Sequence, residues 1–406
     1  MSVQSSSSTL RIVEPAIQNY AWGKVGSASK VALLAKEGDH TGSFKIDESK
    51  PYAELWMGDH PNGVCHMAQG GETIHAWFAT EEGREFLGSV KQLPYLFKVL
   101  SIRLALSIQS HPDKALAQRL HRERPDLYKD PNHKPEIAIA LTNFVGMCGF
   151  RPVSEIADFC KKFPELGSLL GADICRQLEG NVQGALKRAY STLMRADGEA
   201  VTKTIAALVS RTPAAGDEAH SLAIELDRQF PGGDVGVLSV FFLNIVHMAP
   251  GQCLYLKANT PHAYVSGDIM ECMACSDNVI RGGLTPKYKD VEVLLESLVF
   301  ESRPASILKP SEMECGAKCE ARTYAPDDID DFEVVKVDAA GEGQLVPSKQ
   351  CMSMGIIISG EGTINGMPVS QGEVVAIRAG AQISIIPEVN TKMEVFIGAC
   401  GRNYSD

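Results

Sequence analysis

The chain has 406 residues and a formal net charge of −11 at pH 7. This length accommodates two or three domains, each with its own hydrophobic core. The acidic charge argues against nucleic acids and anionic membranes as partners, because both repel a negatively charged surface. No apolar run is long enough to span a bilayer. We therefore expect a soluble globular protein, in which an anionic ligand would need a local basic pocket.

The eleven cysteines are an odd number and are scattered along the chain. The first residues lack the basic and apolar segments of a signal peptide, so we expect reduced thiols and a cytoplasmic location. Cys272 and Cys275 form a C-x-x-C motif, but no second pair stands at the spacing of a zinc ribbon. We interpret the two cysteines as packed thiols.

The first apolar segments predict strands. Residues 10–13 form one, and residues 20–24 form an aromatic turn with Trp22, which either covers a hydrophobic core or makes one wall of a sugar pocket. Residues 93–100 predict a buried strand that carries Lys98. A lysine in such a strand either extends to solvent or faces a buried anion, and we expect the first.

Residues 104–111 alternate between apolar and polar side chains, which is the period of a half-buried strand. Ser107, Gln109 and His111 should therefore point to the same side. Asp113 follows at once and predicts the N-cap of a short helix. The polar face thus lies where a strand leads into a helix.

A second polar face precedes the apolar run 137–141. Lys134 and Glu136 lie on one side of this segment by the same parity. His262 lies in a turn at residues 258–264, before a strand-like segment. These side chains are candidates to meet the first polar face.

Together, Gln109, His111, Glu136 and His262 offer two imidazoles, one amide and one carboxylate. This donor set suits zinc or a neighbouring transition ion. With a single anionic ligand, the ion would strongly polarise a bound carbonyl or hydroxyl group. The alternative is that Gln109 and His111 only form hydrogen bonds inside a polar barrel.

The remaining chain divides into a helical and a β-rich part. Residues 152–231 have the helical period and predict a helical insertion. Residues 235–243 predict a return to strands. Beyond about residue 302, short strands with glycine turns predict a jelly-roll barrel. No histidine follows His262, so we expect this barrel to pack against the rest rather than to bind metal.

With these segments in place, the sequence resembles the type I mannose-6-phosphate isomerases, which are related to the cupins. The resemblance extends over most of the chain and departs from the family at Val64 and Cys65, where Pro-Ser is usual. The matching segments are 20–23 (YAWG), 53–58 (AELWMG), 107–114 (SIQSHPDK), 128–136 (YKDPNHKPE), 149–152 (GFRP) and 261–290.

The resemblance implies a mainly β fold of cupin-like jelly-roll barrels, one catalytic and one C-terminal, with an α-helical domain. The implied domains are 1–152 and 236–305 for the two parts of the catalytic barrel, 153–235 for the helical domain, and 306–406 for the C-terminal jelly roll. The resemblance also implies that Gln109, His111, Glu136 and His262 bind one zinc ion per chain.

The implied activity is that of a zinc-dependent aldose–ketose isomerase. It would interconvert mannose 6-phosphate and fructose 6-phosphate through a cis-enediol and so feed GDP-mannose synthesis. The partner would be this small sugar phosphate, and we expect a monomer. Moving a proton between C2 and C1 requires a base near the carbon, an electrophile at the developing oxyanion, and an anchor for the phosphate.

Cationic and hydroxyl side chains are candidates for the anchor. Arg281 would stabilise the oxyanion or bind the phosphate, and Lys287 and Ser107 would bind the phosphate. Lys98 and Lys134 would add positive potential in an otherwise acidic protein.

The identity of the base stays open. Lys134 shares the metal face, and zinc and Arg281 would lower the pKa of its ammonium. His133 has the better intrinsic pKa but lies on the opposite side by parity. Glu271 is a third candidate. Tyr264 would shuttle a proton or line the pocket, and both groups could instead support the ligands from behind.

Two other functions use similar residues. A cupin-type Fe²⁺ oxygenase would also place His and Glu in the mouth of a barrel, but it gives no role to Ser107, Arg281 and Lys287. A non-catalytic, sugar-binding bicupin would not need the polar face between Ser107 and Glu136.

Overall fold

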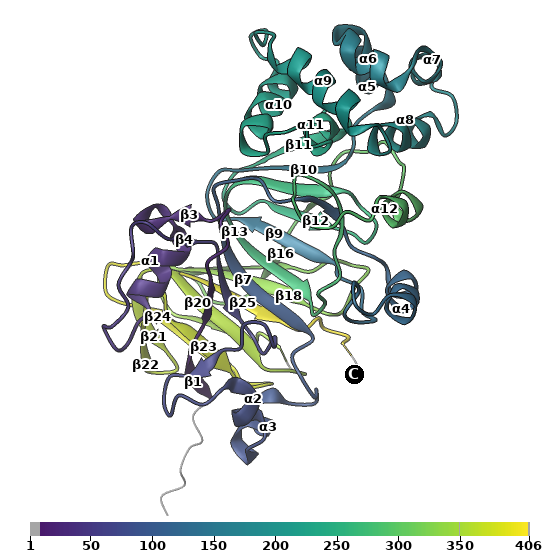
Figure 1. The fold of residues 1–406 in the computed structure, drawn as a ribbon. Helices are drawn as coiled ribbons and strands as arrows, with labels where there is room; N and C mark the ends of the chain where they lie inside the picture. The colour runs from purple at the N-terminus through teal and green to yellow at the C-terminus, as the bar shows by residue number, and fades with distance from the viewer. Residues whose placement is uncertain (1–8, 349, 405–406) are drawn as a thin grey trace, which may run out of the picture.

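The computed structural model describes residues 9–348 and 350–404. It has three parts (Figure 1): a β-barrel in the middle, a group of helices at one end, and a second β-barrel at the other. The predicted fold class, mainly β with a helical insertion and two cupin-like barrels, is confirmed.

The central barrel is formed by an 11-stranded sheet that folds over on itself. Its long strand β13 (His262–Ala274) joins the two halves, because its first residues pair with β8 and β10 and its later residues pair with β7 and β9. The strand bends at Gly267, where φ is +116° and an added Cβ would lie 2.7 Å from the Asn143 carbonyl oxygen. The other strands are β2 (Ala16–Gln18), β5 (Glu54–Met57), β7 (Tyr95–Ile102), β8 (Ile108–Ser110), β9 (Glu136–Ala140), β10 (Phe144–Phe150), β11 (Leu243–Met248), β12 (Cys253–Leu256), β14 (Ile280–Gly283) and β15 (Ile307–Leu308).

Strand alternation decides which side chains face the inside of this barrel. Lys98 on β7 pairs directly with Glu271 on β13, and Glu271 pairs with Ala138 on β9. Leu100 and Ala138 belong to the apolar core inside the barrel. The inside of the barrel therefore carries apolar side chains next to a buried charged pair.

The helical part inserts between β10 and β11, as predicted, and its core contains the expected stripes, for example Ile156, Ile205 and Leu226. The strand predicted at residues 235–243 is wrong: residues 236–239 form α11 (Gly236–Ser239). This run is apolar except for Ser239 and is buried from Gly236 on, and such a run has no period that separates a strand from a buried helix. The other helices are α5 (Val153–Lys162), α6 (Pro164–Leu170), α7 (Ala172–Glu179), α8 (Ala185–Met194), α9 (Gly198–Val209) and α10 (Glu218–Gln229).

The C-terminal barrel packs its two sheets around an apolar core. One sheet holds β16 (Ser311–Met313), β17 (Cys319–Tyr324), β18 (Glu333–Ala339), β20 (Ser353–Ser359), β23 (Val374–Ile377) and β25 (Met393–Ala399), and the other holds β19 (Gly343–Leu345), β21 (Glu361–Ile364), β22 (Met367–Ser370) and β24 (Ile383–Pro387).

The N-terminal segment completes this barrel. Strand β1 (Leu10–Glu14) pairs with β23, and β6 (His66–Met67) pairs with β1. The domain boundaries proposed from the sequence stay a prediction, but the first strand of the chain lies in the sheet of the last domain.

Short elements link these parts. Helix α4 (Lys114–Glu123) begins after Asp113, whose side chain accepts a hydrogen bond from the Leu116 N–H, as predicted. The others are β3 (Lys24–Val25), β4 (Pro51–Tyr52), a 3₁₀ turn (Gly26–Ala28), α1 (Lys30–Glu37), α2 (Ile74–Phe78), α3 (Glu81–Leu87) and α12 (Val291–Ser297).

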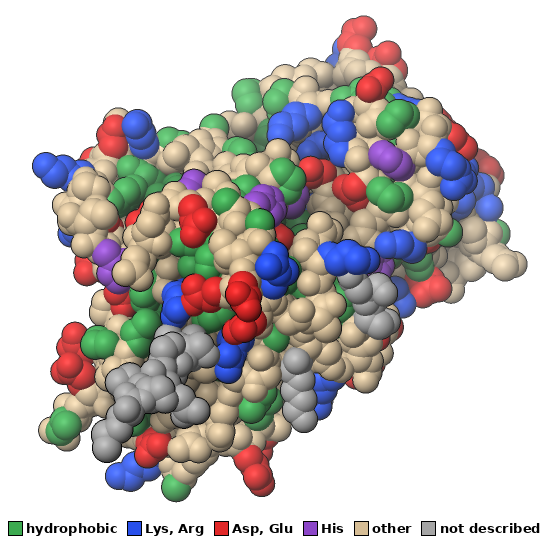
Figure 2. Space-filling model, turned by 90° about the horizontal axis from the view of Figure 1, so that it is seen from below, with side chains coloured by type: hydrophobic (Ala, Val, Ile, Leu, Met, Phe, Trp, Pro, Cys, Tyr) green, Lys and Arg blue, Asp and Glu red, His purple; other side chains and the backbone are tan. Residues whose placement is uncertain are grey.

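All eleven cysteines are free thiols. Cys272 is buried in the core between the two barrels, and the Cys275 thiol lies 3.4 Å from the Leu93 carbonyl oxygen. Both are packed thiols, as interpreted from the sequence. In the described part of the chain, no helix has the length and apolar character needed to cross a membrane. On the face shown in Figure 2, acidic and basic side chains are interspersed.

Candidate metal centre and active site

Three predicted metal ligands converge where strands β8, β9 and β13 of the central barrel meet. His111 directly follows β8, while Glu136 and His262 begin β9 and β13. The potential ligand atoms of the three side chains lie within 4.8 Å of one another. His111 Nε2 is 3.4 Å from Glu136 Oε1, and His262 Nε2 is 3.6 Å from Glu136 Oε2. All three side chains are buried.

Hydrogen bonds to backbone carbonyls fix the orientation of both imidazoles. His111 Nδ1 is 2.8 Å from the Asn278 carbonyl oxygen, and His262 Nδ1 is 2.9 Å from that of Thr260. A carbonyl oxygen can only accept, so each Nδ1 carries a proton and each ring turns its Nε2 toward Glu136. Carbonyl contacts of this kind hold metal-binding histidines in place.

Three side-chain atoms that face each other in this cluster receive no hydrogen bond from the described residues. His111 Nε2, His262 Nε2 and Glu136 Oε2 are buried without a hydrogen-bond partner among the described residues. Buried acceptors without a donor are costly. A cation bound between them would satisfy all three, so these residues fit a metal ion of the zinc type.

The protonation states also suit a metal centre. Burial works against the charge of Glu136, but the neighbouring His111 and Lys134 outweigh it and lower the pKa of the carboxyl group. Burial, followed by the charge of His111, lowers the pKa of His262 to about 4. At neutral pH, the site therefore holds a carboxylate and a neutral His262 imidazole, the forms that bind metal.

Gln109 lies beside this cluster in the sheet. It pairs directly with His262 across β8 and β13, and with Arg281 across β8 and β14. Residues that face each other in neighbouring strands point to the same side of the sheet. The role of Gln109 as the fourth ligand stays a prediction, which this register supports.

Lys134 lies on the ligand side, as strand parity predicted. Its Nζ is 3.6 Å from Glu136 Oε1, and its side chain is mostly buried. His133 points elsewhere: its Nε2 is 3.0 Å from the carboxylate oxygens of Asp331 in the C-terminal part. Of the two neighbours, Lys134 is the one beside the metal cluster.

The prediction that Lys98 extends to solvent is wrong. Its side chain is only 8% exposed, and its Nζ lies 3.1 Å from Glu271 Oε2 and 3.5 Å from Glu54 Oε2. Burial alone would lower the pKa of Lys98, but Glu54 and Glu271 reverse this and raise it, so the ammonium stays charged. Tyr264 completes the network by donating a hydrogen bond of 2.9 Å to Glu271 Oε1.

Sequence reasoning gave no role to Glu54 and Trp56. The Trp56 ring lies 4.9 Å from Lys98 Nζ, and its indole N–H donates to Glu54 at 2.5 Å. The signal that could have revealed Glu54 is a carboxylate within a short, otherwise apolar segment, since such a group needs a buried cation.

The three groups predicted to bind anions differ in burial. Ser107 and Arg281 are half-buried, and Lys287 is exposed. Burial lowers the pKa of Arg281. Arg281 forms no hydrogen bond or ion pair with any residue between 9 and 404 that the structure describes. A half-buried guanidinium without a protein partner is well suited to an anionic ligand.

Trp22 fits both interpretations of the sequence. It packs against the core inside the barrel and stacks on Tyr20, with 5.9 Å between ring centroids. Tyr20 is 40% exposed. Its pKa is raised by burial and then by the charge of Glu54, so Tyr20 lies near the charged network.

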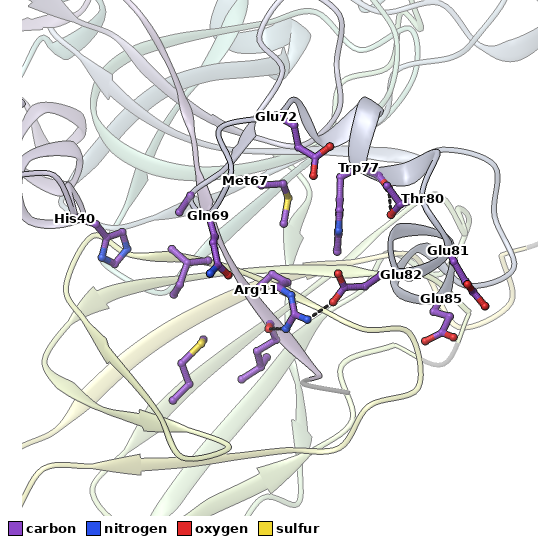
Figure 3. Close-up of a pocket in the computed structure, with 14 residues that line it drawn as sticks. Arg11, His40, Met67, Gln69, Glu72, Trp77, Thr80, Glu81, Glu82 and Glu85 are labelled. Atoms are coloured by element: carbon purple, nitrogen blue, oxygen red, sulfur yellow. Dashed lines mark hydrogen bonds and ion pairs between the residues drawn. The ribbon is translucent and has the colours of Figure 1, made fainter. Parts of the chain in front are cut away.

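A cavity of about 960 Å³ lies away from the metal cluster (Figure 3). Residues of β1, β6, α2 and α3 line it, and Arg11 points across it to form an ion pair with Glu82. None of the predicted site residues lines this cavity. The size of a cavity alone therefore does not identify the active site of this protein.

The fold and the cluster define a class, a metal-dependent enzyme on a cupin-type barrel with a helical insertion. Comparisons with known families specify it further. Residues 10–153 match the catalytic domain of type I phosphomannose isomerase, and residues 168–243 match its helical insertion domain.

Curated relatives and solved structures agree with these matches. The chain is 41% identical over 397 residues to rat mannose-6-phosphate isomerase, covering 90% of each, and 38% identical over 418 residues to the human enzyme, covering 95% of this chain and 97% of that one. A crystal structure of zinc-bound mannose 6-phosphate isomerase is 28% identical, with a TM-score of 0.81 over 97% of this chain and 100% of that one. The R274A mutant of phosphomannose isomerase from Salmonella typhimurium gives the same values. The chain belongs to the type I phosphomannose isomerase family, and it is a zinc-dependent isomerase of that family.

Proposed function

We propose that the chain interconverts mannose 6-phosphate and fructose 6-phosphate, with one zinc ion held by Gln109, His111, Glu136 and His262. The observation that carries this proposal is the convergence of two imidazole nitrogens and one carboxylate oxygen that have no hydrogen-bond partner among the described residues, in a chain of this family. When bound, zinc polarises a substrate oxygen and stabilises the negative charge that develops on it.

The phosphate of the substrate binds Arg281, with Lys287 and Ser107 beside it. Arg281 has no hydrogen-bond or ion-pair partner in the part of the chain that the structure describes, which supports this assignment, as does its register next to Gln109. A guanidinium can bind two phosphate oxygens at once, which orients the sugar as well as anchoring it.

Lys134 transfers the proton between C2 and C1, through a cis-enediol. Its position beside Glu136 supports this choice over His133, which is bound to Asp331. Glu271 is the weaker candidate, because Lys98 and Tyr264 already occupy its two oxygens. We assign Glu271, Tyr264 and Lys98 to holding the wall of the pocket and its charge, and Trp22 to covering the sugar.

The cellular role follows from the reaction. We propose that the enzyme works as a cytoplasmic monomer and supplies mannose 6-phosphate for GDP-mannose synthesis. The eleven free thiols suit a reducing compartment. Family membership favours this function over the cupin-type oxygenase and the non-catalytic bicupin.

Two substitutions separate metal binding from substrate binding. Gln109→Ala should lose zinc and activity together, because it removes a ligand. Arg281→Ala should keep zinc but lower kcat/KM by about 10²-fold, because it removes charge-assisted hydrogen bonds to the phosphate that are worth about 2–3 kcal/mol. Zinc content by mass spectrometry and the rate of isomerisation are the measurements.

Arg322→Ala, on the exposed surface of β17, is the matched control and should change neither quantity. Full zinc content and near-normal turnover in Gln109→Ala would contradict the assignment of Gln109 as a zinc ligand.

A further inference from the structure

The segment between Arg281 and Lys287 has an unusual backbone. Leu284 adopts φ +53°, a left-handed conformation that bulky L residues rarely take. Its side chain is buried in the core that it shares with Val237 and Leu238 of α11. Something must hold this residue in place while its side chain stays buried.

The carboxylate of Asp234 holds this segment through its backbone. Asp234 Oδ1 accepts hydrogen bonds of 2.7 Å from the N–H groups of Leu284 and Gly236, and Oδ2 accepts one of 3.2 Å from the Thr285 N–H. Lys289 Nζ lies 4.0 Å from Oδ2. Three backbone donors converge on one charged acceptor, an arrangement stronger than neutral hydrogen bonds.

The contact leaves no room for side chains between the two segments. A Cβ on Gly283 would lie 2.6 Å from Gly236 Cα, and one on Gly236 would lie 2.6 Å from the Leu284 nitrogen. The loop that leaves β14 and the start of α11 therefore meet backbone to backbone. Since α11 ends the helical insertion, this is a direct link from that insertion to the active site.

The link lies close to the proposed phosphate site. Gly283 pairs with Ile108, and Arg281 pairs with Gln109, in the same two strands. Lys287 follows Thr285, whose hydroxyl accepts a hydrogen bond from the Lys287 N–H at 3.1 Å. The bonds from Asp234 thus fix the backbone between the two cations.

We propose that Asp234 is a positioning residue for phosphate recognition: its carboxylate holds residues 283–287 in the conformation that presents Arg281 and Lys287 to the substrate phosphate. Asp234 acts through the loop backbone, and it does not touch the substrate. This inference rests on the proposed function, in which these two cations bind the phosphate.

The first test compares Asp234→Ala and Asp234→Asn. Asp234→Ala should raise KM for mannose 6-phosphate, and the inhibition constant of inorganic phosphate, about tenfold, since it removes charge-assisted hydrogen bonds. Zinc content should not change, and kcat should change much less than KM. Asp234→Asn keeps one carbonyl oxygen and should give a smaller rise. Asp227→Ala, an acidic residue of α10 outside the proposed site, should leave both constants unchanged.

A second pair of variants tests the backbone conformation itself. Leu284→Gly and Leu284→Ala both remove the buried side chain, but only glycine adopts φ +53° without strain. In the Asp234→Asn background, Leu284→Gly should therefore give a lower KM than Leu284→Ala. If Asp234→Ala does not fold, this comparison of KM values still tests whether the conformation of the loop positions the phosphate site.

Two results would overturn the inference: folded Asp234→Ala with an unchanged phosphate inhibition constant, or equal KM values for the two Leu284 variants. The proposed function fails separately. If Arg281→Ala leaves phosphate inhibition unchanged, the phosphate site itself is wrong. If only Arg281→Ala weakens inhibition, the site stands and Asp234 has no positioning role.

Discussion

Lys98 is a charge placed inside the barrel between two carboxylates. From the sequence, a lysine in an apolar strand is ambiguous, because the partners that decide its direction lie on β5 and β13, far away in the chain. By contrast, local strand parity predicts that Gln109 and His111 share one face and that Lys134 and Glu136 share another. In the structure, His111, Glu136 and Lys134 do lie together. Local periodicity reveals a face, but not the partner that it meets.

Lys98→Met should destabilise the protein strongly. Removing the ammonium leaves Glu54 and Glu271 as buried carboxylates without a cation, which costs about 3–5 kcal/mol. Adding Glu54→Gln and Glu271→Gln should restore much of this loss. Thermal unfolding of the zinc-loaded variants measures the effect.

Lys203→Met is the control, since this lysine is 74% exposed and pairs with Glu199 of the same helix. Equal unfolding temperatures for Lys98→Met and Lys203→Met would show that the buried network does not stabilise the fold.

The elements of this chain differ in how much of each could be predicted. Helix α4 has a capping aspartate, and the helical insertion has a clear period, so both were found. The run before β11 is almost entirely apolar, so the sequence does not distinguish its short helix from a strand. The pairing of β1 with β23 and the bonds from Asp234 to Leu284 join distant segments, and such contacts leave no local pattern.

Asp113 connects helix α4 with the turn that precedes His262. Its Oδ1 caps the helix, and its Oδ2 accepts a 2.9 Å hydrogen bond from Asn259, whose N–H donates to the His111 carbonyl. Asp113→Ala should lower the free energy of unfolding by about 1 kcal/mol through loss of the cap. Asp113→Ser can still cap and should lose less. Denaturant titration is the measurement, and equal losses in the two variants would contradict a capping role.

At the scale of the whole molecule, the two barrels are joined by a shared core. The outer face of the catalytic sheet, with Phe97 and Met270, packs against Ile356 and Phe396 of the C-terminal sheet. Because β1 also lies in that C-terminal sheet, the two parts should unfold together. The C-terminal barrel thus supports the catalytic sheet from behind.

Glu333, which is buried in this C-terminal sheet, should contribute to the pH dependence of the free energy of unfolding. Burial, only partly offset by Arg402, raises the pKa of Glu333 from 4.5 to about 7. The folded state therefore binds more protons than the unfolded state between these values, so the stability from this group is present below about pH 4.5 and is lost as the pH rises through about 7. Glu333→Gln should flatten this decline and be more stable than the parent protein at about pH 8. Unfolding temperatures at about pH 5 and 8 test it, and parallel curves for the two proteins would refute the assignment.

The most direct test of the account is the isomerisation of mannose 6-phosphate by the purified protein, measured before chelation, after chelation and after zinc is restored. The account predicts activity at the start, its loss when zinc is removed, and its return with zinc. Activity that survives complete removal of the metal, or a zinc-loaded protein that does not isomerise mannose 6-phosphate, would contradict it.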